Sequence, residues 1–329
     1  MEKGAELFLV DGIELADFGG EGPILLFSHA NGYPPRVYSQ LLSKLSKNFQ
    51  VFKRSEVLGV VTKNTRCFAV AGTHGKTTTT SNIGMTLARL EYRTLLVDAD
   101  VGLRNLDLLL GLENRIIYTG LDVLNGTCRL EQSIIQDKRQ PKLAFFPLSS
   151  NQIKSPVTKE QVKELIQRVE SDYDYILIDS PAGIDEGFKT SIQAAKEAIV
   201  VVTPEVPSIR DADRVIGILM AKNIKKINLI INRIRPNMVK TDNMMSIEDV
   251  KNILGIPLIG VIPDSEKVII ASNRGEPVVL DDQSSLPGLA FENTARRLVG
   301  EDVSFLNLVS TPSRNPIKRI LGNFVGRNN

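Results

Sequence analysis

A glycine-rich loop between an apolar run and a helical pattern constrains the fold of this chain more than any other feature. The apolar run covers residues 66–71, the loop reads GTHGKTTTT over 72–80, and the helical pattern covers 77–90. Glycines let the backbone wrap closely around an anion, and the unpaired N–H groups at a helix start point toward it. This order of features predicts a strand, a phosphate-binding loop and a helix.

The same loop carries side chains suited to a nucleoside triphosphate and its cation. Lys76 is expected to reach the β- and γ-phosphates and to take part in catalysis, and the Thr77 hydroxyl is expected to bind Mg²⁺. Val70 stands where the usual pattern of such loops has its first glycine, so the match is imperfect. The loop residues expected to bind ATP are Gly72, Thr73, His74, Gly75, Lys76, Thr77 and Thr78.

Short apolar runs alternate with helical patterns along the rest of the chain. The runs are rich in Val, Ile and Leu, as strands buried on both faces of a parallel sheet are. This alternation predicts an α/β domain with a doubly wound, mostly parallel sheet at 66–302. The predicted strands are 66–71, 94–98, 143–146, 175–179, 198–203, 227–232 and 258–263, and the predicted helices are 77–90, 159–169, 188–196, 212–222 and 247–254.

Acidic residues follow two of the predicted strands. Asp98 and Asp100 come at the end of the second strand, and Asp179 ends the fourth. Ligands of open α/β sheets bind beyond the carboxyl ends of the strands, where acids can hold Mg²⁺ and orient an attacking water. We therefore expect Asp98 and Asp179, with Thr77, to hold Mg²⁺ in a nucleotide hydrolase.

Composition excludes several other kinds of protein. The chain has 329 residues with 40 Lys and Arg against 38 Asp and Glu, a net charge of +2. That balance, with 42% hydrophobic residues, excludes a mainly disordered chain and predicts no nucleic-acid partner. No run of about 18 apolar residues occurs, so we expect no membrane-spanning helix. Two cysteines and two histidines are too few for a disulfide framework or for most histidine metal sites.

Five long stretches carry a family resemblance. They are DADVGLRNLDLLLGLENR (98–115), ILIDSPAGIDEGF (176–188), TPEVPSIRDADRVIGIL (203–219), INRIRPNM (231–238) and SNRGEPVVLD (272–281). With them, residues 82–300 resemble the MinD family of division-site ATPases. The resemblance implies a P-loop NTPase with a deviant Walker A loop, of the SIMIBI class and ParA/MinD type. It also implies ATP and Mg²⁺ as cofactors and an ATP-dependent homodimer.

The same resemblance implies partners and a location. The family binds an anionic membrane surface through its C-terminus and works with a MinC-like inhibitor of FtsZ assembly and a MinE-like activator. The chain is then expected to be cytoplasmic and peripheral on the inner face of the cell membrane, or to lie in the plastid stroma and on the inner envelope.

Individual residues match functional positions of the family. Asp100 resembles the acid that orients the hydrolytic water, and Asp179 resembles the Walker B acid. Asn232 and Pro263 resemble adenine contacts. The switch region and the partner surface are expected at Arg104, Asn105 and Asp211.

Ala71 is the main departure from the family. The family reads K-G-G-x-G-K-T at its phosphate loop, and Ala71 stands in place of the first lysine, which reaches the phosphates across the dimer. Two functions therefore stay open. One is an ATPase that binds membrane when ATP is bound and positions the division septum by recruiting an inhibitor of FtsZ. The other is a nucleotide-binding scaffold with little or no turnover.

The N-terminal part resembles other proteins. Residues 21–51 resemble the start of an α/β-hydrolase, and residues 52–80 resemble the ATP loop of a Mur ligase, UDP-N-acetylmuramate–alanine ligase. A Ser-His-Asp hydrolase is excluded because no GxSxG motif occurs and no histidine follows His74. We predict that 1–65 form an extension of foreign character that packs poorly, because it lacks the rest of its core.

The last segment, 303–329, combines basic residues with one apolar stripe. No acidic residue follows Asp302, and apolar residues recur with helical spacing. This pattern fits a terminal helix docked on the core, but the missing acids and the terminal position favour an amphipathic membrane anchor. The residues expected at the membrane are Ile317, Lys318, Arg319, Ile320, Leu321, Phe324 and Val325.

Overall fold

The computed structural model describes residues 65–100, 105–149, 157–281 and 285–308, together with four strands nearer the N-terminus. The chain divides into two compact units, residues 1–64 and 65–329. The division lies beside the predicted boundary between the N-terminal extension and the nucleotide-binding domain. The predicted tail begins within the second unit, and its residues from 309 onward lie outside the described part of the chain.

The first unit contains a four-stranded sheet with the order β1-β2-β4-β3. Its strands are β1 (Glu6–Val10), β2 (Ile13–Asp17), β3 (Ile24–Phe27) and β4 (Gln50–Lys53). β2 pairs antiparallel with both β1 and β4, whereas β3 and β4 are parallel. The packing of this unit depends on side chains outside the described residues, so its poor packing stays a prediction.

The second unit is built on an eight-stranded sheet with the order β12-β11-β10-β5-β9-β6-β8-β7. Its strands are β5 (Arg66–Gly72), β6 (Thr94–Asp98), β7 (Ile135–Gln136), β8 (Leu143–Pro147), β9 (Tyr175–Asp179), β10 (Glu197–Val202), β11 (Lys226–Ile234) and β12 (Leu258–Pro263). All neighbouring strands are parallel except β7 and β8, which are antiparallel. The predicted mostly parallel sheet is thus confirmed. The sequence missed β7, because two residues are too few to form a pattern.

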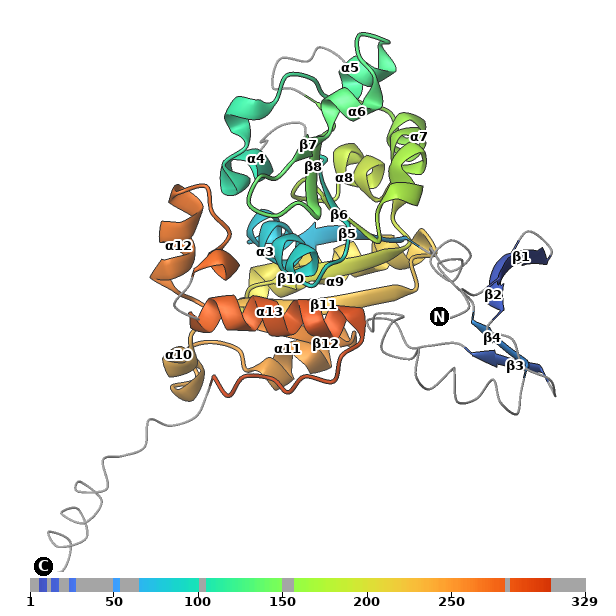
Figure 1. Cartoon of the computed structure of the whole chain (residues 1–329). Helices are drawn as coiled ribbons and strands as arrows, with labels where there is room; N and C mark the ends of the chain where they lie inside the picture. Colours follow the sequence, from blue (N-terminus) through green and yellow to red (C-terminus); the bar gives the residue numbers. More distant parts are fainter. Residues whose placement is uncertain are drawn as a thin grey trace, which may run out of the picture. The chain divides into compact units, whose positions relative to one another are not determined.

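Helices cover both faces of this sheet (Figure 1). They are α3 (Lys76–Arg89), α4 (Leu106–Leu110), α5 (Gly120–Leu124), α6 (Leu130–Ser133), α7 (Lys159–Val169), α8 (Glu186–Ser191), α9 (Val206–Ala221), α10 (Pro236–Lys240), α11 (Ile247–Leu254), α12 (Glu266–Asn273) and α13 (Leu286–Val299). α3 and α13 pack on one face, and α7, α9 and α11 pack on the other. Along β5, Phe68 and Val70 join the first layer, and Ala69 and Ala71 join the second. The continuous apolar run of this strand follows from burial on both faces.

Some helices differ from the prediction. The helix predicted at 212–222 starts earlier, at Val206, because Pro207 occupies the first turn, where proline is tolerated. The helix predicted at 188–196 is found as α8, which ends earlier, at Ser191. The sequence patterns did not reveal the short helices α4, α5, α6 and α10. They also did not reveal α12 and α13. Each begins after a serine cap, Ser265 or Ser285, whose hydroxyl accepts a backbone N–H. Such a cap marks a helix start in sequence.

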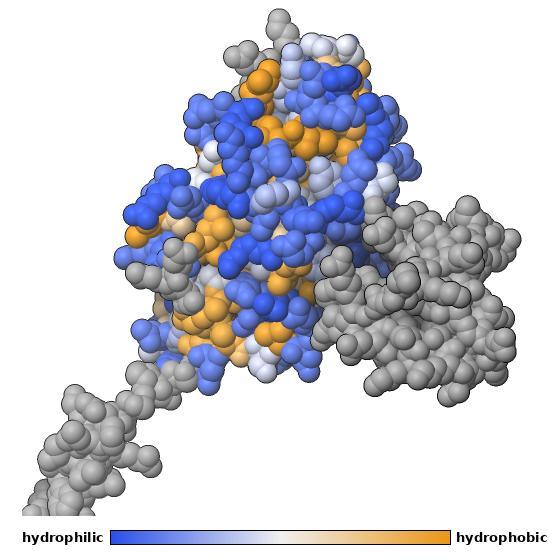
Figure 2. All heavy atoms as spheres, in the orientation of Figure 1, coloured by the Kyte–Doolittle hydropathy of each residue, from blue (hydrophilic) through white to orange (hydrophobic). Residues whose placement is uncertain are grey.

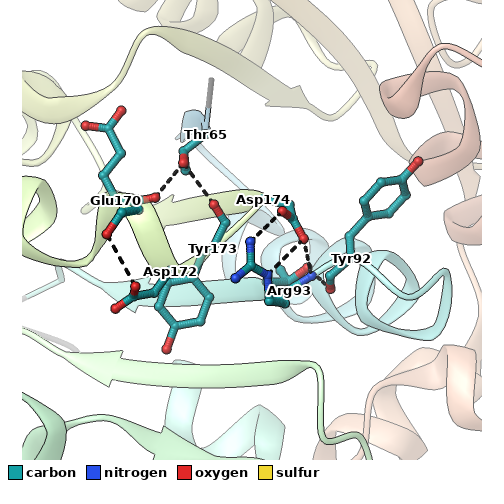
Figure 3. Close-up of polar contacts among 9 residues, drawn as sticks. Thr65, Tyr92, Arg93, Glu170, Asp172, Tyr173 and Asp174 are labelled. Carbon is teal, nitrogen blue, oxygen red and sulfur yellow. Dashed lines mark hydrogen bonds and ion pairs between the residues drawn. The ribbon is translucent and has the colours of Figure 1, made fainter. Parts of the chain in front are cut away.

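Polar contacts join the N-terminal ends of three central strands, β5, β6 and β9 (Figure 3). The loop lies at the other end of β5. The Thr65 hydroxyl donates to the carbonyl oxygens of Glu170 and Tyr173, the latter at 2.8 Å. Arg93 donates to Asp174 through its backbone N–H at 2.8 Å and through Nη2 at 3.0 Å. These bonds tie the starts of β5, β6 and β9 to one another.

The surface drawn in Figure 2 is mostly hydrophilic, with hydrophobic side chains in separate patches. Within the ranges described above, no helix combines the length and the apolar character needed to cross a membrane. Exposed large hydrophobic residues include Leu108, Val206, Met220, Ile253, Ile269 and Ile270.

Candidate functional site

Two glycines shape the loop between β5 and α3. Gly72 has φ +127° and Gly75 has φ +83°, values that residues with a Cβ atom rarely adopt. A Cβ atom on Gly72 would lie 2.0 Å from the Val201 carbonyl oxygen, and one on Gly75 would lie 2.0 Å from Nδ2 of Asn232. Both positions therefore favour glycine, and at Gly72 the contact with a strand backbone leaves no room for a Cβ atom. The resulting tight turn precedes α3 and has the form of a backbone cradle that can bind an anion.

The first turns of α3 direct polar groups toward Asp179 at the end of β9. Lys76 is the first residue of α3 and is 8% exposed, and its ammonium group attracts the Asp179 carboxylate. The Thr77 hydroxyl donates a hydrogen bond to that carboxylate, and Thr80 Oγ1 lies 3.4 Å from Asp179 Oδ1. A lysine, two hydroxyls and a carboxylate thus lie close together at the N-terminus of α3. This is the donor set that phosphates and Mg²⁺ require.

Asp98 and Asp179 lie side by side on β6 and β9. Both are buried, at 3% and 2% exposure. Burial raises the pKa of Asp179 to about 7, and burial together with repulsion from Asp179 raises the pKa of Asp98 well above its usual value. Asp98 also accepts the backbone N–H groups of Asp100 at 3.1 Å and Leu106 at 3.3 Å. Two buried carboxylates this close favour a proton or a cation, so these residues fit Mg²⁺.

Asp100 lies at the same carboxyl ends of the strands, two residues after β6. It is partly exposed, and its charge acts on the Asp179 carboxylate. The structure thus brings the three predicted acids together. Their proximity follows from strand order, because β6 and β9 are neighbours and both end here.

The raised pKa of Asp179 leads to a prediction of how folding stability depends on pH. Its pKa is about 7 in the folded chain, against about 3.9 for an unfolded chain. Between these values the folded state holds more protons, so the free energy of unfolding falls as pH rises from about 4 to 7. Asp179→Asn stays neutral. Without nucleotide or divalent cations, we expect it to raise the Tm above wild type at pH 7 and much less at pH 5.

Thermal unfolding followed by circular dichroism at several pH values between 5 and 8 measures this effect. Asp213→Asn, an exposed position on α9, serves as the control for the change of residue type. A Tm difference between Asp179→Asn and wild type that does not grow with pH would contradict the prediction.

A cavity of about 330 Å³ opens beside the loop. His74, Gly75 and Thr78 line it from the loop and α3. Asn232 and Pro263 line it from the ends of β11 and β12. The two residues predicted to contact adenine therefore lie next to the predicted phosphate loop, although they are far from it in sequence. The cavity continues from the phosphate cradle, which is where a base attached to bound phosphates would lie.

The cavity has further lining residues that the sequence patterns did not reveal. Arg233 adopts φ +58°, and its Nε lies 3.3 Å from Asp264 Oδ1. Arg235 Nε lies 2.7 Å from Asp264 Oδ2. Most of the others belong to α12, whose serine cap was the available sequence signal. The missed lining residues are Arg233, Asp264, Ser265, Val268, Ile269, Ser272 and Asn273.

Other predicted residues do not line this cavity. Asp211 is partly exposed on α9, and its Oδ1 lies 4.0 Å from Arg214 Nη1. Asn105 is exposed immediately before α4. Arg104 and the predicted membrane residues between 317 and 325 lie outside the described residues.

Comparisons with known proteins identify the family of this chain. The family described as the CobQ/CobB/MinD/ParA nucleotide binding domain matches residues 68–278. That range includes the loop, the three acids and both predicted adenine contacts. A putative septum site-determining protein MinD from Emiliania huxleyi is 71% identical over 253 residues, which cover 77% of this chain and 93% of that protein.

Solved structures of MinD proteins share the fold. A chain of the MinC:MinD cell division protein complex from Aquifex aeolicus is 43% identical with a TM-score of 0.68, covering 73% of this chain and 98% of that one. The septum site-determining protein MinD complexed with Mg-ADP from Pyrococcus horikoshii is 26% identical with a TM-score of 0.64, covering 72% and 99%. These findings give no support to the hydrolase and Mur-ligase resemblances of residues 21–51 and 52–80. The chain belongs to the CobQ/CobB/MinD/ParA nucleotide-binding family and, within it, to the MinD-type septum site-determining ATPases.

Proposed function

We propose that the chain binds ATP and Mg²⁺ at the loop and the three acids, and that ATP hydrolysis switches it between states in septum placement. The observation that carries this proposal is the convergence of Lys76, Thr77 and the buried pair Asp98 and Asp179 beside a glycine cradle. The Pyrococcus horikoshii relative is described with Mg-ADP, which supports the same nucleotide class and cation here.

Each group of residues has one task in this proposal. The loop backbone and Lys76 bind the phosphates, and Thr77, Asp98 and Asp179 hold Mg²⁺. Bound Mg²⁺ neutralises charge on the phosphates and on the leaving group. Asp100 accepts a hydrogen bond from the attacking water and orients it. Asn232 and Pro263, which line the cavity beside the loop, contact the adenine.

The proposal extends to an ATP-dependent homodimer that binds membrane through its tails. A single short amphipathic helix binds weakly, and two tails on one dimer bind far more tightly through avidity. The Aquifex aeolicus relative is solved as a MinC:MinD complex, which supports a MinC-like partner for this chain. A MinE-like activator and a partner surface at Arg104, Asn105 and Asp211 remain part of the proposal. So does a peripheral position on the inner cell membrane or, in a plastid, on the inner envelope.

Co-sedimentation with anionic liposomes tests this switch. The full chain is expected to pellet with ATPγS and to stay in the supernatant with ADP or without nucleotide. Phe324→Asp removes an apolar contact of about 1.5–3 kcal/mol, so membrane affinity is expected to fall about tenfold or more. Asn323→Asp adds the same charge beside the proposed stripe and serves as the matched control. Equal pelleting in all three nucleotide conditions would contradict the coupling of ATP to membrane binding.

A second candidate function is a scaffold that binds ATP with little or no turnover. Ala71, where the family has lysine, is fully buried at the end of β5 and supplies no charge to a transition state stabilised by electrostatics. Phosphate release with liposomes and an activator separates the two functions. Tight ATP binding without phosphate release would favour the scaffold.

A further inference from the structure

A pair of hydroxyl groups ties the phosphate loop to helix α9. Thr73 Oγ1 and Ser208 Oγ lie 2.9 Å apart, so that one donates a hydrogen bond to the other. Ser208 belongs to the first turn of α9 and is 3% exposed. Thr73 stands where the pattern K-G-G-x-G-K-T has its second glycine. The contact therefore uses a side chain that a glycine at this position cannot supply.

The Ser208 hydroxyl is held in place by the sheet. The backbone N–H of Thr203, directly after β10, donates to Ser208 Oγ at 3.0 Å. β10 is the neighbour of β5, and Val201 pairs with Gly72. Both sides of the hydroxyl pair thus extend from adjacent central strands. With its oxygen held by Thr203, the Ser208 hydroxyl gives the Thr73 side chain a hydrogen-bond partner in a fixed place.

We infer that Ser208 is a positioning residue for the nucleotide: through Thr73 it holds the first half of the phosphate loop in its binding conformation. This inference rests on the proposed function, because it assumes that the loop binds phosphates. Between Gly72 and Gly75 the loop consists of Thr73 and the exposed His74 alone. Anchoring the Thr73 side chain therefore limits the directions in which the backbone N–H groups of this short loop segment can point. Groups oriented before binding stabilise a phosphate without the cost of ordering the loop.

Two substitutions test the hydroxyl pair in the full chain. Thr73→Val removes one hydroxyl and keeps the shape of the side chain, and Ser208→Ala removes the other. Isothermal titration with ATP and Mg²⁺ is expected to give a Kd about five- to tenfold higher for each variant, in line with one lost hydrogen bond. The double variant is expected to bind no more weakly than Ser208→Ala alone, because both changes act through one contact. Thr73→Ser keeps the hydroxyl and is expected to bind ATP more tightly than Thr73→Val.

Ser191→Ala is the matched control for loss of a buried helical serine. Ser191 is 1% exposed, and its hydroxyl donates to the Phe188 carbonyl within α8 at 2.7 Å. This change is expected to lower the Tm and to leave the Kd unchanged. An unchanged Kd in Thr73→Val, or losses that add in the double variant, would overturn the inference. An unchanged Kd in Lys76→Ala would instead overturn the proposed function.

Discussion

Alanine in place of Lys76 is expected to weaken ATP binding about 100-fold and to abolish hydrolysis. Lys76 is 8% exposed at the first position of α3, between the glycine cradle and Asp179. A hydrogen bond to a charged group contributes about 1.5–3 kcal/mol, and each 1.4 kcal/mol changes affinity about tenfold. Isothermal titration measures the affinity, and phosphate release measures hydrolysis.

Lys159→Ala is the matched control. Lys159 is likewise the first residue of a helix, α7, but it pairs with Glu186, an exposed residue of α8. Its loss is expected to leave ATP affinity unchanged, because surface ion pairs contribute little. If Lys76→Ala bound ATP within about twofold of wild type, Lys76 would not be a phosphate ligand.

Gly72→Ala is expected to destabilise the second unit more than any other single methyl addition in the loop. The added Cβ would lie 2.0 Å from the Val201 carbonyl oxygen and 2.9 Å from its carbonyl carbon, and φ is +127°. Both contacted atoms belong to the backbone of central strand β10, which cannot move without breaking its pairing with β5. We expect a loss of about 3 kcal/mol or more in the free energy of unfolding. The Tm then falls by roughly 6–12 °C for a domain of this size.

Gly126→Ala separates backbone strain from the steric clash. Gly126 also has positive φ, +72°, but a Cβ there meets nothing within 4 Å. Its replacement is expected to cost only the strain of the left-handed conformation, about 1 kcal/mol. Thermal unfolding of both variants gives the comparison. Equal Tm values would mean that the close approach of β10 does not fix the loop at Gly72.

Sequence patterns predicted the strands of the large sheet with one exception, and the reason is local. Strands buried on both faces need an unbroken apolar run, and such runs are visible without knowledge of their neighbours. The sequence did not predict β7, because this edge strand has only two residues. The helices α12 and α13 were missed although Ser265 and Ser285 cap them, and α12 supplies much of the wall of the cavity.

Local sequence was enough to predict the phosphate loop and the acidic strand ends, because a few consecutive residues define each of them. Gly72 and Gly75 allow a turn that other residues cannot adopt, and the strand ends carry Asp98 and Asp179 whatever lies beside them. Which distant residues lie beside the loop became visible only in the folded chain. Asn232 reaches Gly75 and Ser208 reaches Thr73 because β10 lies beside β5 in the sheet and β11 follows next to β10. That strand order results from packing helices on both faces of the sheet, and residue spacing along the chain does not encode it.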